Sequence, residues 1–144
     1  MDTVTIFVIF WIFAASFVVT GLIRSGKKAL SIFPKLENDL VVYRDKNASG
    51  YSLKSWKTKI LRTRKSLDII VLEEEIWLKC IVINARVHEK IDLIHKINKR
   101  MIQNVEVKNN QITLSFMTMS DELKQIVLIT KKMNDFIDAL GIEN

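Results

Sequence analysis

The chain has 144 residues, enough for one domain, and carries 22 Lys and Arg against 16 Asp and Glu, a net charge of +6. A single cysteine excludes a disulfide scaffold within the chain, and four Gly with one Pro exclude collagen-like and Gly/Pro-rich disordered sequences. Residues 3–23 contain no charged side chain, so residues 24–144 hold every basic residue and have a net charge of +7. The chain is therefore expected to join an apolar N-terminal segment to a basic, folded remainder.

The uncharged segment is long enough to cross a bilayer as a helix. Its 21 residues, 16 of them apolar, reach ~31 Å at about 1.5 Å per residue, the thickness of the hydrocarbon core. A cleaved secretory signal is the alternative, but such signals have a basic start and an apolar core of about 7–15 residues. Because this chain starts with Met1-Asp2, we predict an uncleaved transmembrane anchor over residues 1–23.

The basic residues that follow the span predict its orientation. Arg24, Lys27 and Lys28 come directly after it and no basic residue precedes it. The positive-inside rule then places the N-terminus outside and residues 24–144 in the cytoplasm, as expected for a single-pass protein of the inner (cell) membrane. The same three cations are candidates for contact with anionic headgroups at the membrane surface, and a topology signal alone is the alternative.

After the span we expect a basic juxtamembrane linker over residues 24–49, with a short strand at 40–43, and a soluble domain over residues 50–144. The domain is rich in short, alternating and β-branched stretches, which predict about seven strands. They are residues 51–60, 67–72, 75–81, 91–97, 105–107, 112–116 and 123–130. One long helix from residue 66 to about residue 86 is the alternative for the second and third of these strands.

Turn and cap signals divide the second half of the chain. Asn109-Asn110 tolerates the positive φ of a tight hairpin, and Glu73-Glu74 is another turn candidate. Residues 131–140 predict a helix with Thr130 as its N-cap and Gly141 after its C-terminus. Its apolar stripe consists of Met133, Phe136, Ile137 and Leu140. We expect a mainly β domain, a small antiparallel barrel whose open end is capped by this helix.

Several stretches resemble the bacterial pleckstrin-homology-like family in its membrane-anchored form. They are Gly50–Lys54, Leu67–Lys79, Asp92–Ile97 with Ile102 and Val105 beyond, and the strand and helix that end at Leu140. The resemblance covers residues 50–141 and implies a small barrel of about seven strands with a C-terminal helix, and a binding rather than a catalytic role. The final helix carries Phe136 where eukaryotic pleckstrin-homology domains have a Trp.

A run of six cations within twelve residues is the candidate ligand site. It consists of Lys54, Lys57, Lys59, Arg62, Arg64 and Lys65. The resemblance implies phosphate binding here, because eukaryotic lipid-binding members use a basic pair of the kind that Arg62 and Arg64 form. Guanidinium groups suit phosphate oxygens, and an anchor keeps them near anionic headgroups. A solvated basic face without a ligand is the alternative.

The sequence contains no P-loop, GxSxG, HExxH or dinucleotide fingerprint, so no enzyme activity is expected. His88, expected in a loop, and His95, expected on a strand, lack partners at ligand spacing, so we expect neither a metal nor another cofactor. Cys80 is expected to be buried and inert. No nucleic-acid-binding motif accompanies the basic charge.

Two functions remain open. The first is a non-enzymatic, membrane-anchored adaptor that contacts a protein partner, such as another membrane protein, or anionic lipid headgroups. The second is a structural protein that oligomerises with itself through the domain and the transmembrane helix. A binder can act as a monomer, whereas an assembly module must self-associate, so the stoichiometry of the chain separates them.

Overall fold

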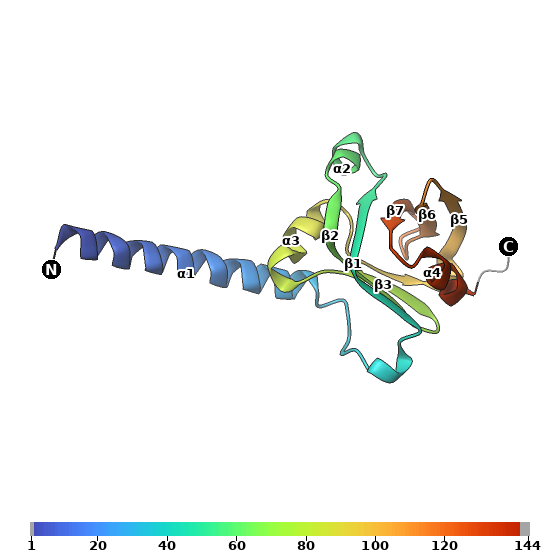
Figure 1. The fold of residues 1–144 in the computed structure, drawn as a ribbon, viewed down its shortest axis with the longest axis horizontal. Helices are drawn as coiled ribbons and strands as arrows, with labels where there is room; N and C mark the ends of the chain where they lie inside the picture. Colours follow the sequence, from blue (N-terminus) through green and yellow to red (C-terminus); the bar gives the residue numbers. More distant parts are fainter. Residues whose placement is uncertain (1, 142–144) are drawn as a thin grey trace.

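A computed structural model describes residues 2–141. Met1 and residues 142–144, where the predicted anchor begins and the predicted domain ends, lie outside the described residues. A long helix, α1 (Thr3–Ala29), extends away from a mainly β domain (Figure 1). The domain contains β1 (Tyr43–Ser52), α2 (Trp56–Ile60), β2 (Thr63–Val71), β3 (Glu75–Lys79), α3 (Val82–Lys90), β4 (His95–Asn98), β5 (Ile102–Lys108), β6 (Gln111–Met117), β7 (Leu123–Ile129) and α4 (Met133–Leu140). Two 3-10 turns, η1 (Asn38–Leu40) and η2 (Lys99–Met101), precede β1 and β5.

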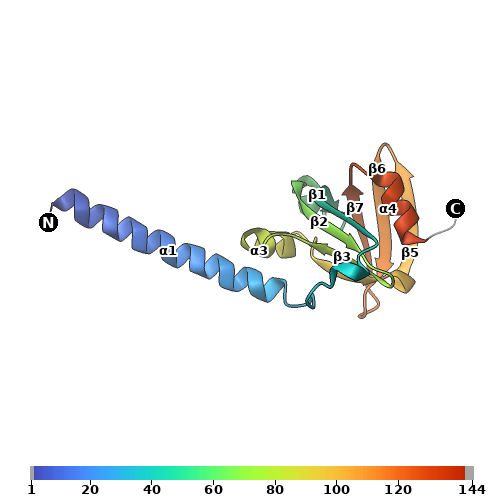
Figure 2. The ribbon, with the colours of Figure 1, turned by 60° about the horizontal axis from the view of Figure 1, so that its bottom comes forward.

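The seven strands form one antiparallel sheet in the order β4-β3-β2-β1-β7-β6-β5. β1 is the central strand of the sheet. Its first part pairs with β2, and its last part, residues 49–52, pairs with β7. Register shifts between Asp45 and Gly50 allow the strand to bend between these partners. The sheet curls, and α4 lies across its open end (Figure 2). The predicted fold class, a mainly β antiparallel domain with a C-terminal helix and a preceding apolar helix, is confirmed.

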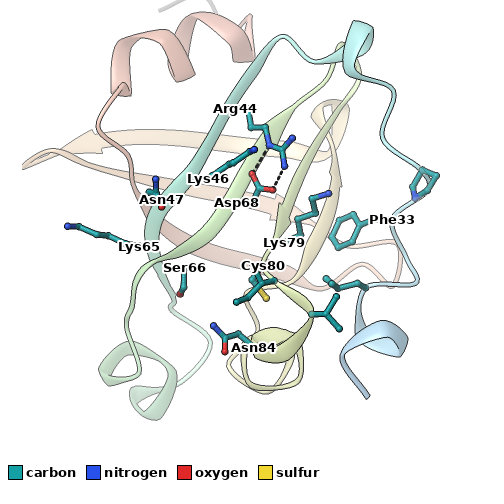
Figure 3. Close-up of a pocket in the computed structure, with 14 residues that line it drawn as sticks. Phe33, Arg44, Lys46, Asn47, Lys65, Ser66, Asp68, Lys79, Cys80 and Asn84 are labelled. Atoms are coloured by element: carbon teal, nitrogen blue, oxygen red, sulfur yellow. Dashed lines mark hydrogen bonds and ion pairs between the residues drawn. The ribbon is translucent and has the colours of Figure 1, made fainter. Parts of the chain in front are cut away.

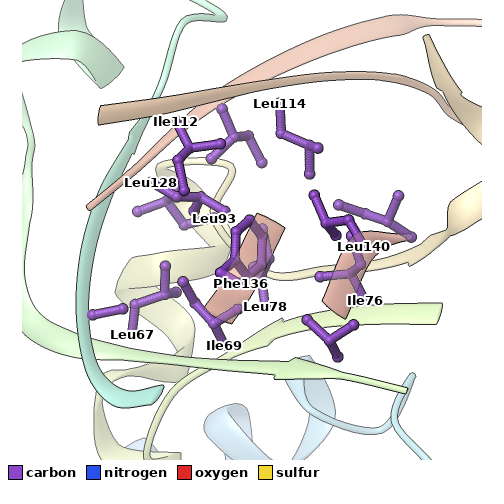
Figure 4. Packing of buried hydrophobic residues seen from close by; sticks show 14 of the residues in the cluster. Leu67, Ile69, Ile76, Leu78, Leu93, Ile112, Leu114, Leu128, Phe136 and Leu140 are labelled. Atoms are coloured by element: carbon purple, nitrogen blue, oxygen red, sulfur yellow. The ribbon is translucent and has the colours of Figure 1, made fainter. Parts of the chain in front are cut away.

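One apolar core fills the inside of the curled sheet (Figure 4). α4 closes it with Phe136, which is fully buried and lies edge-on to Tyr43 with ring centroids 5.5 Å apart. The predicted stripe of α4 is confirmed, since Leu140 is also buried and Met133 and Ile137 pack against the same core. The turn signals are confirmed as well: Asn109-Asn110 has positive φ at both residues, and Gly141 ends α4 in the left-handed region.

The prediction of a first strand at residues 51–60 is wrong. β1 ends at Ser52, and residues 56–60 form α2 because Ser55 and Thr58 make a capping box. The Ser55 hydroxyl accepts the backbone N–H of Thr58 at 3.2 Å, and the Thr58 hydroxyl accepts the N–H of Ser55 at 3.0 Å. β1 also begins at Tyr43, inside the predicted linker, so the predicted boundary at residue 50 falls within a strand.

The segment after β3 also differs from the prediction. Residues 82–90 form α3, and the strand predicted at 91–97 is the shorter β4. His88 therefore lies in a helix, not a loop, and is buried with its ring nitrogens 3.1 Å from the Ser66 hydroxyl and 2.9 Å from the Asn84 carbonyl. The alternative of one long helix from residue 66 is wrong, because β2 and β3 form a hairpin.

The N-cap predicted for the last helix is wrong by two residues. Lys132, not Thr130, precedes α4. The Thr130 hydroxyl donates instead to the Asp45 carboxylate at 2.6 Å and lies 2.6 Å from the Tyr43 hydroxyl. The same hydroxyl accepts the backbone N–H of Lys132 at 3.3 Å, and its long-range contact with β1 ties the end of β7 to the start of the sheet.

The end of α1 packs on the domain instead of leading into a free linker. Gly26 and Ala29 are buried, and a Cβ at Gly26 would overlap the backbone carbonyl of Val82 at the start of α3. A second, smaller apolar cluster forms around this contact. It consists of Ala29, Cys80, Ala85 and Ile94, with Leu30 and Phe33 packed against them. The helix thus continues six residues beyond the predicted end of the anchor at Ile23.

Candidate functional site

An open groove of about 790 Å³ lies between the end of α1, the strands β1 to β3 and the start of α3 (Figure 3). Four cations from three strands line it: Arg44 and Lys46 of β1, Lys65 of β2 and Lys79 of β3. One acid, Asp68 of β2, lies among them, and Phe33, Pro34 and Ile81 are among its apolar lining residues. We call this cleft the basic groove.

Strand pairing brings the charges together. Arg44 and Lys46 are two residues apart on β1, so their side chains share a face, and Lys79 lies opposite Asp68 in the β2–β3 register. The Arg44 guanidinium donates to both Asp68 oxygens, Nε to Oδ1 at 3.0 Å and Nη2 to Oδ2 at 2.7 Å. This hydrogen bonding raises the pKa of Arg44. The bidentate pair neutralises Asp68 and leaves a net positive charge in the groove.

Lys79 is the most enclosed of the three lysines. Burial lowers the pKa of its ammonium group, although Asp68 acts in the opposite direction. Its Nζ lies 5.8 Å from the Trp77 ring centroid, and the Phe33 ring packs on the same Trp77 at 5.6 Å. A partly desolvated cation favours an anionic partner. The segment that follows α1 therefore helps to build the wall beside Lys79.

Cys80 also lines the groove, and it is buried as the sequence predicted. Burial raises the pKa of its thiol to about 11. The thiol therefore stays protonated at neutral pH, and nucleophilic or metal chemistry, which needs the thiolate, is suppressed there. The groove therefore combines a net positive charge with an unreactive thiol.

The six predicted cations do not gather in one site. Lys65 lines the basic groove, whereas Lys57 and Lys59 lie on α2. Lys54 and Arg62 lie in the segments that flank α2, and Arg64 lies on β2. All six are exposed. The exposed Trp56 and Ile60 of α2 lie among them, with Lys57 Nζ 5.9 Å from the Trp56 ring centroid. The run is therefore divided between the groove and a projecting helix.

Arg24, Lys27 and Lys28, the predicted membrane-surface residues, are exposed on the last turns of α1. Gly26 and Ala29 occupy the side of the helix that packs on the domain. The side of the helix that carries Gly26 and Ala29 therefore faces α3, whereas the three cations face solvent.

Arg44, Lys46 and Lys79 are groove residues that the sequence does not predict. Arg44 and Lys46 lie in the segment that is predicted as a linker. Lys79 lies in a strand that is predicted from its alternating apolar residues. The available signal was alternation, since Arg44 and Lys46 occupy one face of an extended segment and Lys79 shares a face with Trp77. That signal identifies a site only once β1 and β3 are both paired with β2.

A second charged cluster surrounds Asp92, which has a φ of 60°. Its carboxylate accepts hydrogen bonds from Lys124 Nζ at 2.6 Å and from the Ser52 hydroxyl at 3.2 Å, and His95 Nε2 lies 3.3 Å away. Burial acts to raise the pKa of Asp92, but His95 and Lys124 together outweigh it and hold this pKa well below its usual range. These contacts tie β1, β4 and β7 together, which is a structural role.

The basic groove is thus the part of the described chain in which cations, an apolar wall and an open volume coincide. Its position beside the end of α1 connects it to the apolar helix. Neither the models of known protein families nor the curated proteins give a match to this chain.

Proposed function

We propose that the protein is a non-enzymatic, membrane-anchored binding module whose basic groove takes the phosphate-bearing headgroup of an anionic lipid. The observation that carries the proposal is the excess of lysines in a groove that opens beside the end of an apolar helix. Lys46, Lys65 and Lys79 supply the charge, and Arg44 with Asp68 supplies a rigid polar wall. Phosphate oxygens are ligands that such cations favour.

The proposal of a membrane anchor is based on α1. It is 27 residues long, and its most apolar 18-residue stretch has a mean hydropathy of 2.6 with none of it buried against the domain. An apolar helix of this length satisfies its own backbone hydrogen bonds and matches a bilayer core. With Arg24, Lys27 and Lys28 following the span, the domain belongs on the cytoplasmic face of the cell membrane.

Membership of the pleckstrin-homology-like family is part of the same proposal. The seven antiparallel strands and the capping helix α4 are the architecture that the resemblance implies, and they support it. The groove, however, is built mainly from β1, β2 and β3 with α3, and of the six-cation run it uses only Lys65. The ligand site is therefore argued from this chain's own geometry.

Lipid retention by the intact chain tests the proposal. The full chain is reconstituted in nanodiscs with a mixture of phosphatidylcholine and phosphatidylglycerol, then released in the gas phase for native mass spectrometry. We expect retained phosphatidylglycerol on the wild type, and loss of that adduct in the triple variant Lys46→Ala/Lys65→Ala/Lys79→Ala. Inorganic phosphate, added in competition, separates a lipid-specific site from a general phosphate site.

A charge-matched control is available among lysines that do not line the groove. Lys108→Ala/Lys131→Ala/Lys132→Ala removes the same number of lysines near the β5–β6 turn and the start of α4. It should retain the lipid as the wild type does. Equal retention by both triple variants would rule out the groove as the headgroup site.

A second candidate function is supported by the sheet edge at β5. Within residues 2–141, β5 pairs only with β6, and a groove of about 330 Å³ beside it is lined by Val105, Val107, Met133 and Ile137, among others. An extended peptide of a protein partner can add a strand to such an edge. A second copy would use the same edge in the assembly hypothesis, and the chain stoichiometry in the same mass spectra distinguishes the two.

A further inference from the structure

The start of α3 lies close to the level at which α1 leaves the membrane. Gly26, which packs against the Val82 carbonyl, is three residues beyond Ile23, the end of the uncharged span. Three helical residues advance about 4.5 Å. The interfacial layer outside the hydrocarbon core is roughly 5–7 Å thick on each side. Val82 is therefore at the depth of the headgroup layer when α1 spans the bilayer along its normal.

α3 has an inner face and an outer face. Ala85 and His88 are buried on the inner face. Ile83 and Val87, one turn apart on the outer face, are 50% and 60% exposed, and Ile81 just before the helix is 65% exposed. Lys90 is exposed on the same helix, as are Arg86 and Glu89, which pair with each other at 2.7 Å. Large apolar side chains beside cations on an exposed helix face are typical of helices that lie in a membrane interface.

We infer that the outer face of α3 lies in the interfacial layer of the bilayer that α1 crosses, as a second attachment of the domain to the lipid. The inference rests on the proposed anchor. Figure 1 shows α3 as the helix of the domain beside the end of α1, and the Gly26–Val82 contact fixes the two helices against one another. The domain is then held in one orientation on the membrane and does not swing on a linker.

The same contact explains how the basic groove meets lipid headgroups. Val82 and Asn84 of α3, and Ile81 just before it, also line the groove. With these residues at headgroup depth, the groove opens at the level where lipid phosphates lie. Lipid is favoured over a protein as the occupant because the apolar face continues from a membrane-spanning helix and is flanked by Arg24, Lys27 and Lys28, which suit an anionic surface.

Site-specific fluorescence on the full chain in nanodiscs tests this inference. Ile83→Cys and Val87→Cys are each labelled with an environment-sensitive fluorophore, and the wild type reports the background from Cys80, which is buried. We expect a blue-shifted emission, a several-fold smaller quenching constant for aqueous iodide than at a solvent site, and strong quenching by a nitroxide near the lipid headgroup.

Val42→Cys is the matched control, because Val42 is an apolar residue just before β1 with 59% exposure, close to that of the α3 positions. Its label should be quenched by iodide and not by the lipid nitroxide. Iodide access at Val87 and Ile83 equal to that at Val42 would overturn the inference. So would shielding from iodide without nitroxide quenching, since it would indicate a protein or a second copy on this face. Neither result depends on the groove lysines, so the headgroup proposal is tested separately.

Discussion

Replacing Gly26 with Ala tests whether α1 and the domain form one unit. A Cβ at this position would lie 2.8 Å from the Val82 carbonyl carbon and 3.0 Å from Val82 Cγ1, and it would overlap the carbonyl oxygen. Backbone atoms of α3 cannot rotate aside as a flexible side chain does. The two helices must therefore separate, and the apolar cluster beneath them, which contains Ala29, Cys80 and Ala85, opens.

The reactivity of Cys80 reports this opening. Burial holds the pKa of its thiol at about 11, against an ordinary value of 9.0. Below pH 9 the relief of this burial raises the thiolate fraction by up to about 100-fold, since the thiolate is the reactive form. We expect Gly26→Ala to react with a maleimide at pH 8 at least tens of times faster than the wild type, because opening the cluster also gives the reagent access to the thiol.

Gly21→Ala is the control for this prediction. It makes the same change in the same helix, but a Cβ at Gly21 meets nothing within 4 Å. Its Cys80 should react at the wild-type rate. If Gly26→Ala also reacted at that rate, then α1 does not depend on close packing against α3, and the rigid attachment of the domain would be refuted.

Two further predictions concern the stability of the domain. Asp92→Asn removes one partner from a cluster with 13% side-chain exposure, so it should cost about 3 kcal/mol in chemical unfolding by leaving Lys124 and His95 without their anion. The folded-state pKa of Asp92 is depressed, so its contribution to the free energy of unfolding is present above the unfolded pKa of about 3.9 and is lost as the pH falls below that value. A difference in unfolding free energy between wild type and variant that stays constant from neutral pH into this acid range would contradict the assignment. Phe136→Ala should cost about 3–5 kcal/mol in the same assay, since the ring is fully buried against Tyr43, and a cost near zero would show that α4 does not close the core.

Local patterns predicted the elements whose burial is regular along the chain. The apolar span was found because hydropathy is a property of consecutive residues. The strand near residues 112–116 alternates between core and outer face, and the strand near residues 67–72 is rich in β-branched residues, so their positions are predicted to within about four residues. Gly141 and Asn109-Asn110 were identified because positive φ restricts the residue type.

The elements that the sequence did not predict depend on distant partners. β1 is largely polar, and only its pairing with β2 on one side and β7 on the other makes it a strand. The last turn of α1 is helical against α3, where Gly26 and Ala29 find their contacts. The basic groove has the same origin: Lys65 was identified in a run of cations, whereas Arg44, Lys46 and Lys79 become neighbours only through the register of three strands.

The most direct test of the central claim is a measurement of which lysines lie against lipid phosphate. Solid-state NMR on the ¹⁵N-labelled full chain in phosphatidylglycerol-containing proteoliposomes reports ³¹P–¹⁵N dipolar couplings at individual lysine side chains. The basic groove predicts couplings at Lys46, Lys65 and Lys79. Couplings absent from all three, or confined to Lys54, Lys57 and Lys59 around α2, would contradict it.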